Sequence, residues 1–160
     1  GGQLPVVRDA YHLSQVHPEW QMFFRGDESR LDPGDAVPLM SSDLPEMRAL
    51  AHSAGMMAFE RDPLGRGPWY GVRRHGRLVA QGGTHLLLSR AAELGNVVTA
   101  RVHRRRGYAS RVVAALLRDL HRQGKSIFLQ VLKDNEPAIA LYEKLGFERL
   151  RTMYLVRCRL

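Results

Sequence analysis

The stretch Arg104-Arg105-Arg106-Gly107-Tyr108-Ala109 joins an apolar run, Val97-Val98-Thr99-Ala100, to an amphipathic segment over residues 107–122. This order predicts a strand that leads through a short turn into a helix. A glycine in the turn lets the backbone approach a ligand closely, and the N–H groups of the first helical turn have no partner within the helix. Arginines beside them add bidentate donors for phosphate. We therefore predict a phosphate site, and more specifically a pyrophosphate site, at this junction.

The hydrophobic pattern on either side of the junction predicts an α/β fold. Strands are expected over residues 36–41, 69–74, 77–88, 91–100, 126–132 and 147–159, and helices over residues 43–54, 107–122 and 135–145. The dipeptide His75-Gly76 is typical of a tight turn between antiparallel strands. A strand–helix–strand crossover follows and carries the phosphate site. The sheet is therefore expected to contain both strand directions.

The chain divides by pattern into a leader and one domain. Residues 1–35 form the leader, with a strand over residues 20–25 and a loop over residues 26–35. Residues 36–160 form the domain, and 160 residues are enough for a single sizeable core. Because the chain begins with Gly1-Gly2 and not with Met, we expect a tag scar or an excised fragment that lacks residues upstream.

The charge balance favours an anionic ligand. The net charge is +8, from 24 basic and 16 acidic residues. A basic domain can bind nucleic acid or a polyanionic small molecule. The clustering of arginines near the junction favours a local anion site, and the interleaved aromatics of single-strand binders are absent there. The clustered residues are Arg101, Arg104, Arg105, Arg106 and Arg111.

Cysteine content and hydropathy further limit the class of protein to which the chain can belong. Cys158 is the only cysteine, which excludes a disulfide framework and a cysteine-rich zinc site. No apolar run is long enough to span a bilayer, and no signal peptide is present. We expect a cytoplasmic protein with no membrane partner and no bound metal.

A second motif, Asn135-Glu136-Pro137-Ala138-Ile139-Ala140-Leu141-Tyr142-Glu143-Lys144-Leu145-Gly146-Phe147, lies downstream of the junction. Together the two motifs resemble the GNAT (N-acetyltransferase) superfamily. The junction is similar to its acyl-CoA loop, Gln/Arg-x-x-Gly-x-Gly/Ala, and the second motif to Asn-x-x-Ala-x-x-Leu-Tyr-x-x-x-Gly-Phe. The resemblance covers residues 36–160 and is nearest to uncharacterised bacterial members. It implies a mixed, mostly antiparallel sheet with a splayed parallel strand pair and helices on both faces.

The resemblance also implies how an acyl-CoA would bind. The backbone of the strand before the junction would bond the pantetheine, and the arginine-rich loop would hold the pyrophosphate. Asn135 would make a polar contact to the pantetheine or adenosine side, or only cap its helix. The implied contacts are Val97, Val98, Thr99, Arg104, Arg105, Arg106, Gly107, Tyr108, Ala109 and Asn135.

Two proton-handling residues are implied as well. Tyr142 matches the tyrosine that protonates the departing thiolate. Glu93 lies eleven residues before Arg104, where some family members carry the base, and burial in an apolar strand would raise its pKa. The alternative is a solvent-facing glutamate. Gln130 replaces the glutamate that other members use, and His85 and His103 are further candidates.

Two positions depart from the family pattern. Arg101 stands where proline is frequent, and Arg105 where glycine is frequent. Arg105 therefore requires a negative φ or a modest backbone strain.

The predicted activity is transfer of an acetyl group from acetyl-CoA to a primary amine, by direct attack in a ternary complex. The acceptor is not readable from the sequence. The loop over residues 59–70 is a candidate wall of its site, with Glu60, Asp62, Trp69 and Tyr70 available to a cationic amine. The rival hypotheses are an acyl-CoA-sensing domain without turnover and a nucleic-acid-binding module. A homodimer is left open.

Overall fold

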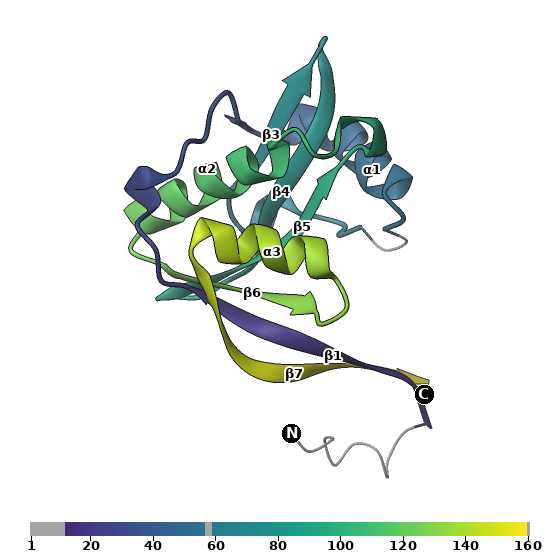
Figure 1. Cartoon of the computed structure of the whole chain (residues 1–160). Coiled ribbons are helices and arrows are strands. Elements are labelled where there is room, and N and C mark those ends of the chain that lie inside the picture. The colour runs from purple at the N-terminus through teal and green to yellow at the C-terminus, as the bar shows by residue number, and fades with distance from the viewer. Residues whose placement is uncertain (1–11, 57–58, 160) are drawn as a thin grey trace.

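The computed structural model describes residues 12–56 and 59–159, and the strands of these ranges form one seven-stranded sheet (Figure 1). The strand order is β2-β3-β4-β5-β6-β1-β7. The strands are β1 (His12–Phe24), β2 (Val37–Pro38), β3 (Trp69–Arg74), β4 (Arg77–Leu87), β5 (Ala91–Thr99), β6 (Ser126–Leu132) and β7 (Phe147–Arg159). Only β5 and β6 pair in parallel; every other neighbouring pair is antiparallel. The predicted mixed, mostly antiparallel sheet is confirmed.

Helices lie on both faces of this sheet, as predicted (Figure 1). They are α1 (Leu44–Ser53), α2 (Tyr108–Arg122) and α3 (Glu136–Leu145). The apolar stripe of α2 packs with Ile139 and Leu145 of α3 in the main core. Met47 and Leu50 of α1 join a second core with Trp69. Within the described ranges, no helix is long and apolar enough to cross a membrane.

Strand β1 differs from the sequence-based expectation. It covers thirteen residues, whereas the pattern predicted only residues 20–25. The pattern failed because Pro18 and the polar residues around it are not typical of a central strand. β6 ends at Leu132, which pairs with Glu19 of β1. Pro18 lies beyond this last pair, so its missing N–H interrupts no hydrogen bond to β6.

The pairing of β1 also corrects the expected division of the chain. β1 runs antiparallel to β6 on one side and to β7 on the other. Residues 12–24 are therefore built into the sheet and do not form a separate leader. The expected strand over residues 36–41 is shorter than predicted, because only Val37 and Pro38 pair with β3.

The parallel pair separates part of the way along. β5 and β6 are in register from Ala91 to Leu94, with Leu94 opposite Leu129. Beyond that point β5 pairs only with β4, and β6 pairs only with β1. The backbone of β5 after Leu94 consequently has one unpaired edge. This is the splayed strand pair that the resemblance implied.

Candidate functional site

The turn between β5 and α2 forms a cationic cradle, which we define as residues 104–109. Gly107 is the N-cap of α2 and has φ 80°, a left-handed conformation that favours glycine. Arg105 has φ 65°. Of the two outcomes expected for Arg105, the structure therefore has the strained one. A side chain on Gly107 would meet no atom within 4 Å, so the space above the helix terminus is open.

The three arginines of the cradle are exposed and available to an anion. None of them forms an ion pair with a carboxylate in the part of the chain that the structure describes. Arg111, by contrast, lies 2.9 Å from Asp35. Three uncompensated cations beside the positive end of a helix dipole suit a pyrophosphate.

The side chain of Tyr108 braces the cradle against the sheet. Its hydroxyl accepts a hydrogen bond from Arg74 Nε at 3.0 Å, and its ring lies under the guanidinium groups of Arg74 and Arg111. Tyr108 is 8% exposed. Tyr108 can therefore offer a ligand its backbone N–H, while its side chain is engaged elsewhere.

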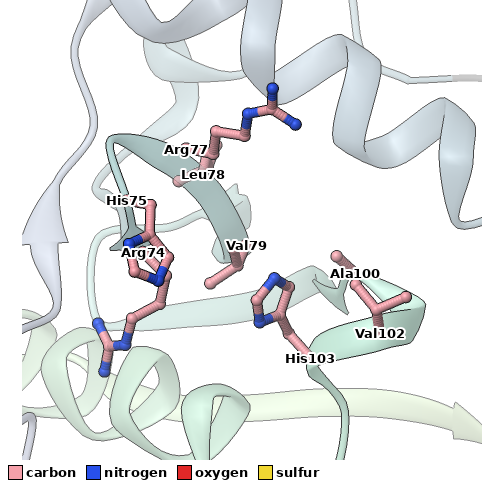
Figure 2. Close-up of a pocket in the computed structure, with 8 residues that line it drawn as sticks. All are labelled: Arg74, His75, Arg77, Leu78, Val79, Ala100, Val102 and His103. Carbon is pink, nitrogen blue, oxygen red and sulfur yellow. The ribbon is translucent and has the colours of Figure 1, made fainter.

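A hollow of about 590 Å³ lies on the β3–β4 side of the cradle (Figure 2). Its lining includes His75 and His103 and no residue of β6. His103, which the sequence suggested as a base, lines this hollow. Figure 2 shows Arg74 and Arg77 extending away from each other on the two sides of the hairpin.

The unpaired edge of β5 borders the gap. Ala100 N donates to Val79 O at 2.8 Å, so the backbone of Ala100 faces β4. Because successive residues of a strand alternate, the N–H and C=O of Thr99 face the gap, and those of Val98 face β4. Val97 lies in a β-bulge, where β5 has one more residue than β4. Of the three predicted pantetheine contacts, Thr99 thus presents its backbone N–H most directly, while its oxygen accepts a hydrogen bond from Arg104 Nε at 3.4 Å.

The second motif forms α3 and its two ends. Asn135 is the N-cap, and its Oδ1 accepts a hydrogen bond from Ala138 N at 3.3 Å. Its amide NH₂ group remains available. Tyr142 packs edge-on against Phe147, and burial raises the pKa of Tyr142 to about 12. A tyrosine in this environment keeps its proton at neutral pH.

Glu93 lies on the sheet face opposite α2 and α3. Its neighbours Ala92 and Leu94 point into the main core, so strand alternation turns Glu93 the other way. The side chain is half-buried. Burial raises the pKa of Glu93, and the charge of a protonated His85 acts in the opposite sense. Glu93 and Tyr142 therefore approach the splayed strands from opposite faces of the sheet.

Sequence reasoning missed two features of this face. Burial raises the pKa of Glu19 in β1, and the negative charge of nearby Glu93 raises it further. His85 Nδ1 lies 2.8 Å from Glu60 Oε1 in the loop before β3. No spacing rule could connect these pairs, because each joins strands or loops that are distant in sequence. In the described ranges, no group of three or more His, Cys, Asp or Glu residues is placed to hold a metal ion.

Comparison with known families gives this geometry a context. The model of the family described as FR47-like protein matches residues 70–156, which is more than half of the chain. The chain belongs to this family. FR47-like proteins are GNAT superfamily members, so the family predicted from the two motifs is confirmed.

Relatives of this FR47-like chain carry acetyltransferase names. The uncharacterized N-acetyltransferase YobR of Bacillus subtilis is 36% identical over 66 residues, which cover 41% of the chain and 27% of YobR. A crystal structure from Novosphingobium aromaticivorans, assigned to the GNAT acetyltransferases, is 32% identical with a TM-score of 0.84, and the match covers 91% of the chain and 65% of that protein. The FR47-like chain thus spans less than two thirds of either relative.

A third similarity concerns the fold alone. The structure of AAC(6')-Iy in complex with the bisubstrate analog CoA-S-monomethyl-acetylneamine is 17% identical with a TM-score of 0.67. The match covers 79% of the FR47-like chain and 98% of AAC(6')-Iy.

Proposed function

We propose that this chain transfers an acetyl group from acetyl-CoA to a primary amine, by direct attack in a ternary complex. The observation that carries the proposal is the unpaired edge of β5, which leads straight into the cationic cradle at the start of α2. Together they offer a strand edge for an amide-containing arm and a helix terminus for a pyrophosphate. Family membership and the CoA analog bound by the similar fold of AAC(6')-Iy support the same ligand.

The chain's own residues would hold acetyl-CoA in three regions. The backbone of Thr99, and of the bulge at Val97, would bond the pantetheine amides. Arg104, Arg106 and the first N–H groups of α2 would bind the pyrophosphate. The free amide group of Asn135 would contact the pantetheine or adenosine side. Cys158 as the single cysteine is compatible with a reducing compartment, and we place the activity in the cytoplasm.

The two proton steps are assigned to opposite faces of the sheet. An acceptor ammonium group must lose a proton before its nitrogen can attack the thioester carbonyl carbon, and we assign this step to the face that bears Glu93. Tyr142 would donate a hydrogen bond, and then its proton, to the sulfur as the C–S bond breaks. The hydroxyl of Tyr142 is protonated at neutral pH, as this role requires, although the burial that raises its pKa to about 12 makes it a weaker acid than an ordinary tyrosine.

Binding of acetyl-CoA is tested by thermal unfolding. A ligand at a hundred times its Kd stabilises a protein by about 2.7 kcal/mol. We expect a clear increase in Tm with acetyl-CoA and a smaller one in the double variant R104Q/R106Q. R30Q/R90Q is the control, because it removes the same charge from exposed arginines outside the cradle. No stabilisation of the wild-type protein at millimolar acetyl-CoA would contradict the proposal.

Turnover is tested by thiol release with a panel of primary amines. Tyr142→Phe should lower kcat by about tenfold or more while the Tm increase with acetyl-CoA is retained. Equal turnover would refute the assigned role. Stabilisation by acetyl-CoA without thiol release from any amine would instead favour the sensing domain.

A further inference from the structure

His85 occupies a bulge in β4, beside the point where β5 and β6 separate. Thr84 is opposite Leu94 and Leu86 is opposite Glu93, so His85 is the extra residue between them. A side chain added to Gly95 would come within 2.9 Å of His85 Cβ. Leu94 is the last residue of β5 in register with β6. The imidazole therefore lies against the first residue of the unpaired edge.

The carboxylate of Glu60 determines which ring nitrogen of His85 carries the proton. Glu60 Oε1 lies 2.8 Å from Nδ1. A carboxylate only accepts hydrogen bonds, so Nδ1 must be the donor and Nε2 of the neutral ring must hold a lone pair. No residue in the described ranges makes a hydrogen bond to Nε2. The Glu60 side chain is 14% exposed, whereas that of His85 is 47% exposed.

Arg66 ties both partners together. Its Nε lies 3.3 Å from Glu60 Oε2, and its Nη1 donates to the backbone oxygen of His85 at 3.2 Å. Glu60 Oε2 is buried without a hydrogen bond, so this ion pair is what balances its charge. The carboxylate is thereby held in one place against the ring.

Charged groups lie on more than one side of His85. Glu60 faces Nδ1, and Glu93 is close enough that a protonated His85 lowers the pKa of Glu93 against the effect of burial. Glu19 extends this acidic group toward β1, where His17 faces it. Arg66 opposes it from the loop. Glu60, Glu93 and Arg66 are thus the charged groups nearest to the imidazole, and Glu19 lies beyond Glu93.

We propose that Nε2 of His85 is the final acceptor of the proton that Glu93 removes from the acceptor amine, with Glu60 as the positioning residue. The proposal rests on the proposed function and specifies the destination of the proton. An imidazole titrates closer to neutral pH than a carboxylate and is the better resting place for it.

The protons balance in this scheme. The ammonium group carries three protons. One passes through Glu93 to Nε2 of His85, and one stays on the nitrogen of the new amide. The third ends on the thiol sulfur through Tyr142. The C–N bond forms and the C–S bond breaks. The half-exposed imidazolium then releases its proton to solvent.

The kinetic test uses the full chain and thiol release with spermidine and a lysine-containing peptide. His85→Gln should lower kcat/KM by about 10²-fold and remove an ionisation from the acid limb of its pH profile. Added imidazole should restore part of the loss. Glu60→Gln should cost about tenfold, because the ring is no longer held in one tautomer. His52→Gln, which removes an exposed imidazole from α1, should have no effect.

A retained rate and an unchanged pH profile in His85→Gln would overturn the proposal, as would a loss that imidazole does not rescue. The Tm increase with acetyl-CoA should be the same in all three variants. Absence of that increase in the wild-type protein would count against the proposed function and not against His85.

A second measurement is independent of the acceptor. Nitrogen-15 spectra of the histidine rings, assigned with His85→Gln, should show Nδ1 protonated and Nε2 unprotonated in the neutral ring of His85. Glu60→Gln should abolish this preference. A proton on Nε2 in the wild-type protein would contradict the proposal.

Discussion

Arg105 is one of two residues other than glycine that have a positive φ in the described ranges, and the other is His75 in its hairpin turn. With φ 65° Arg105 adopts the left-handed conformation that costs an L-residue with a side chain about 1–2 kcal/mol. The turn nevertheless gains a guanidinium group next to the helix terminus. Ligand-binding loops commonly contain such strained residues, because the strained conformation places a functional group where the ligand binds.

Replacement of Arg105 separates these two effects. Arg105→Gly should change the free energy of unfolding by no more than about 1 kcal/mol, because relief of strain offsets the greater freedom of the unfolded chain. Arg105→Val should destabilise by about 1 kcal/mol or more relative to Arg105→Gly, since a β-branched side chain fits this conformation poorly. Urea denaturation measures both. A Val variant as stable as the Gly variant would show that the turn is not strained.

Glu93 should make the stability of the folded protein depend on pH in a predictable direction. Burial raises the pKa of Glu93 above its ordinary value of 4.5, so the folded state binds this proton more tightly than the unfolded state. The group therefore stabilises the fold at low pH, and this contribution is lost as the pH rises through the folded-state pKa.

Glu93→Gln removes that dependence. The Tm of the variant minus the Tm of the wild-type protein should be larger at pH 7 than at pH 4. Thermal unfolding at several pH values across this range measures the difference. Glu148→Gln, at an exposed glutamate of β7, is the matched control and should show no such trend. A difference that is constant with pH would contradict the assigned burial.

At the scale of elements, α3 depends on the cap at its start. Asn135→Ala should cost about 1 kcal/mol of stability, because Ala138 N loses its side-chain acceptor. Asn135→Asp should keep the cap, since a carboxylate accepts the same bond and suits the helix dipole. Urea denaturation of both variants tests this. An Ala variant of wild-type stability would show that solvent replaces the cap.

The same two variants separate capping from cofactor contact. Both lack the amide NH₂ group, so both should show a smaller Tm increase with acetyl-CoA if that group contacts the ligand. An unreduced increase in Asn135→Asp would leave Asn135 as a helix cap alone.

At the scale of the whole molecule, β1 joins the two ends of the chain. β7 has no strand neighbour other than β1 among the described residues, and β6 would lose one of its two partners without it. A chain of residues 36–160 should therefore fail to unfold cooperatively, because it exposes two strand edges and the cavity left by the fully buried Met22. Circular dichroism and calorimetry check this, with the 160-residue chain as the reference. A cooperative transition at the same Tm would restore the boundary at residue 35.

Most local elements could be predicted because their signals lie within a few residues. The turn at His75-Gly76 has positive φ at both positions, as a tight hairpin requires. β6 and β7 have the bounds that the pattern predicted, and α2 begins one residue after Gly107. The first half of β1 escaped prediction, because its strand character comes from partners on both sides and not from its own residues.

Spacing along the chain is enough to specify the helices, most of the strands, the cationic cradle and the family. Only tertiary packing explains which side chains share the face of the sheet that bears Glu93. Glu60 and His85 are 25 residues apart, and they meet only because a bulge turns His85 toward the loop before β3. The charges of Glu19 and Glu93 interact across β6. Such contacts depend on strand order, register and bulges, and these are set by the packing of the whole sheet and not by any local pattern.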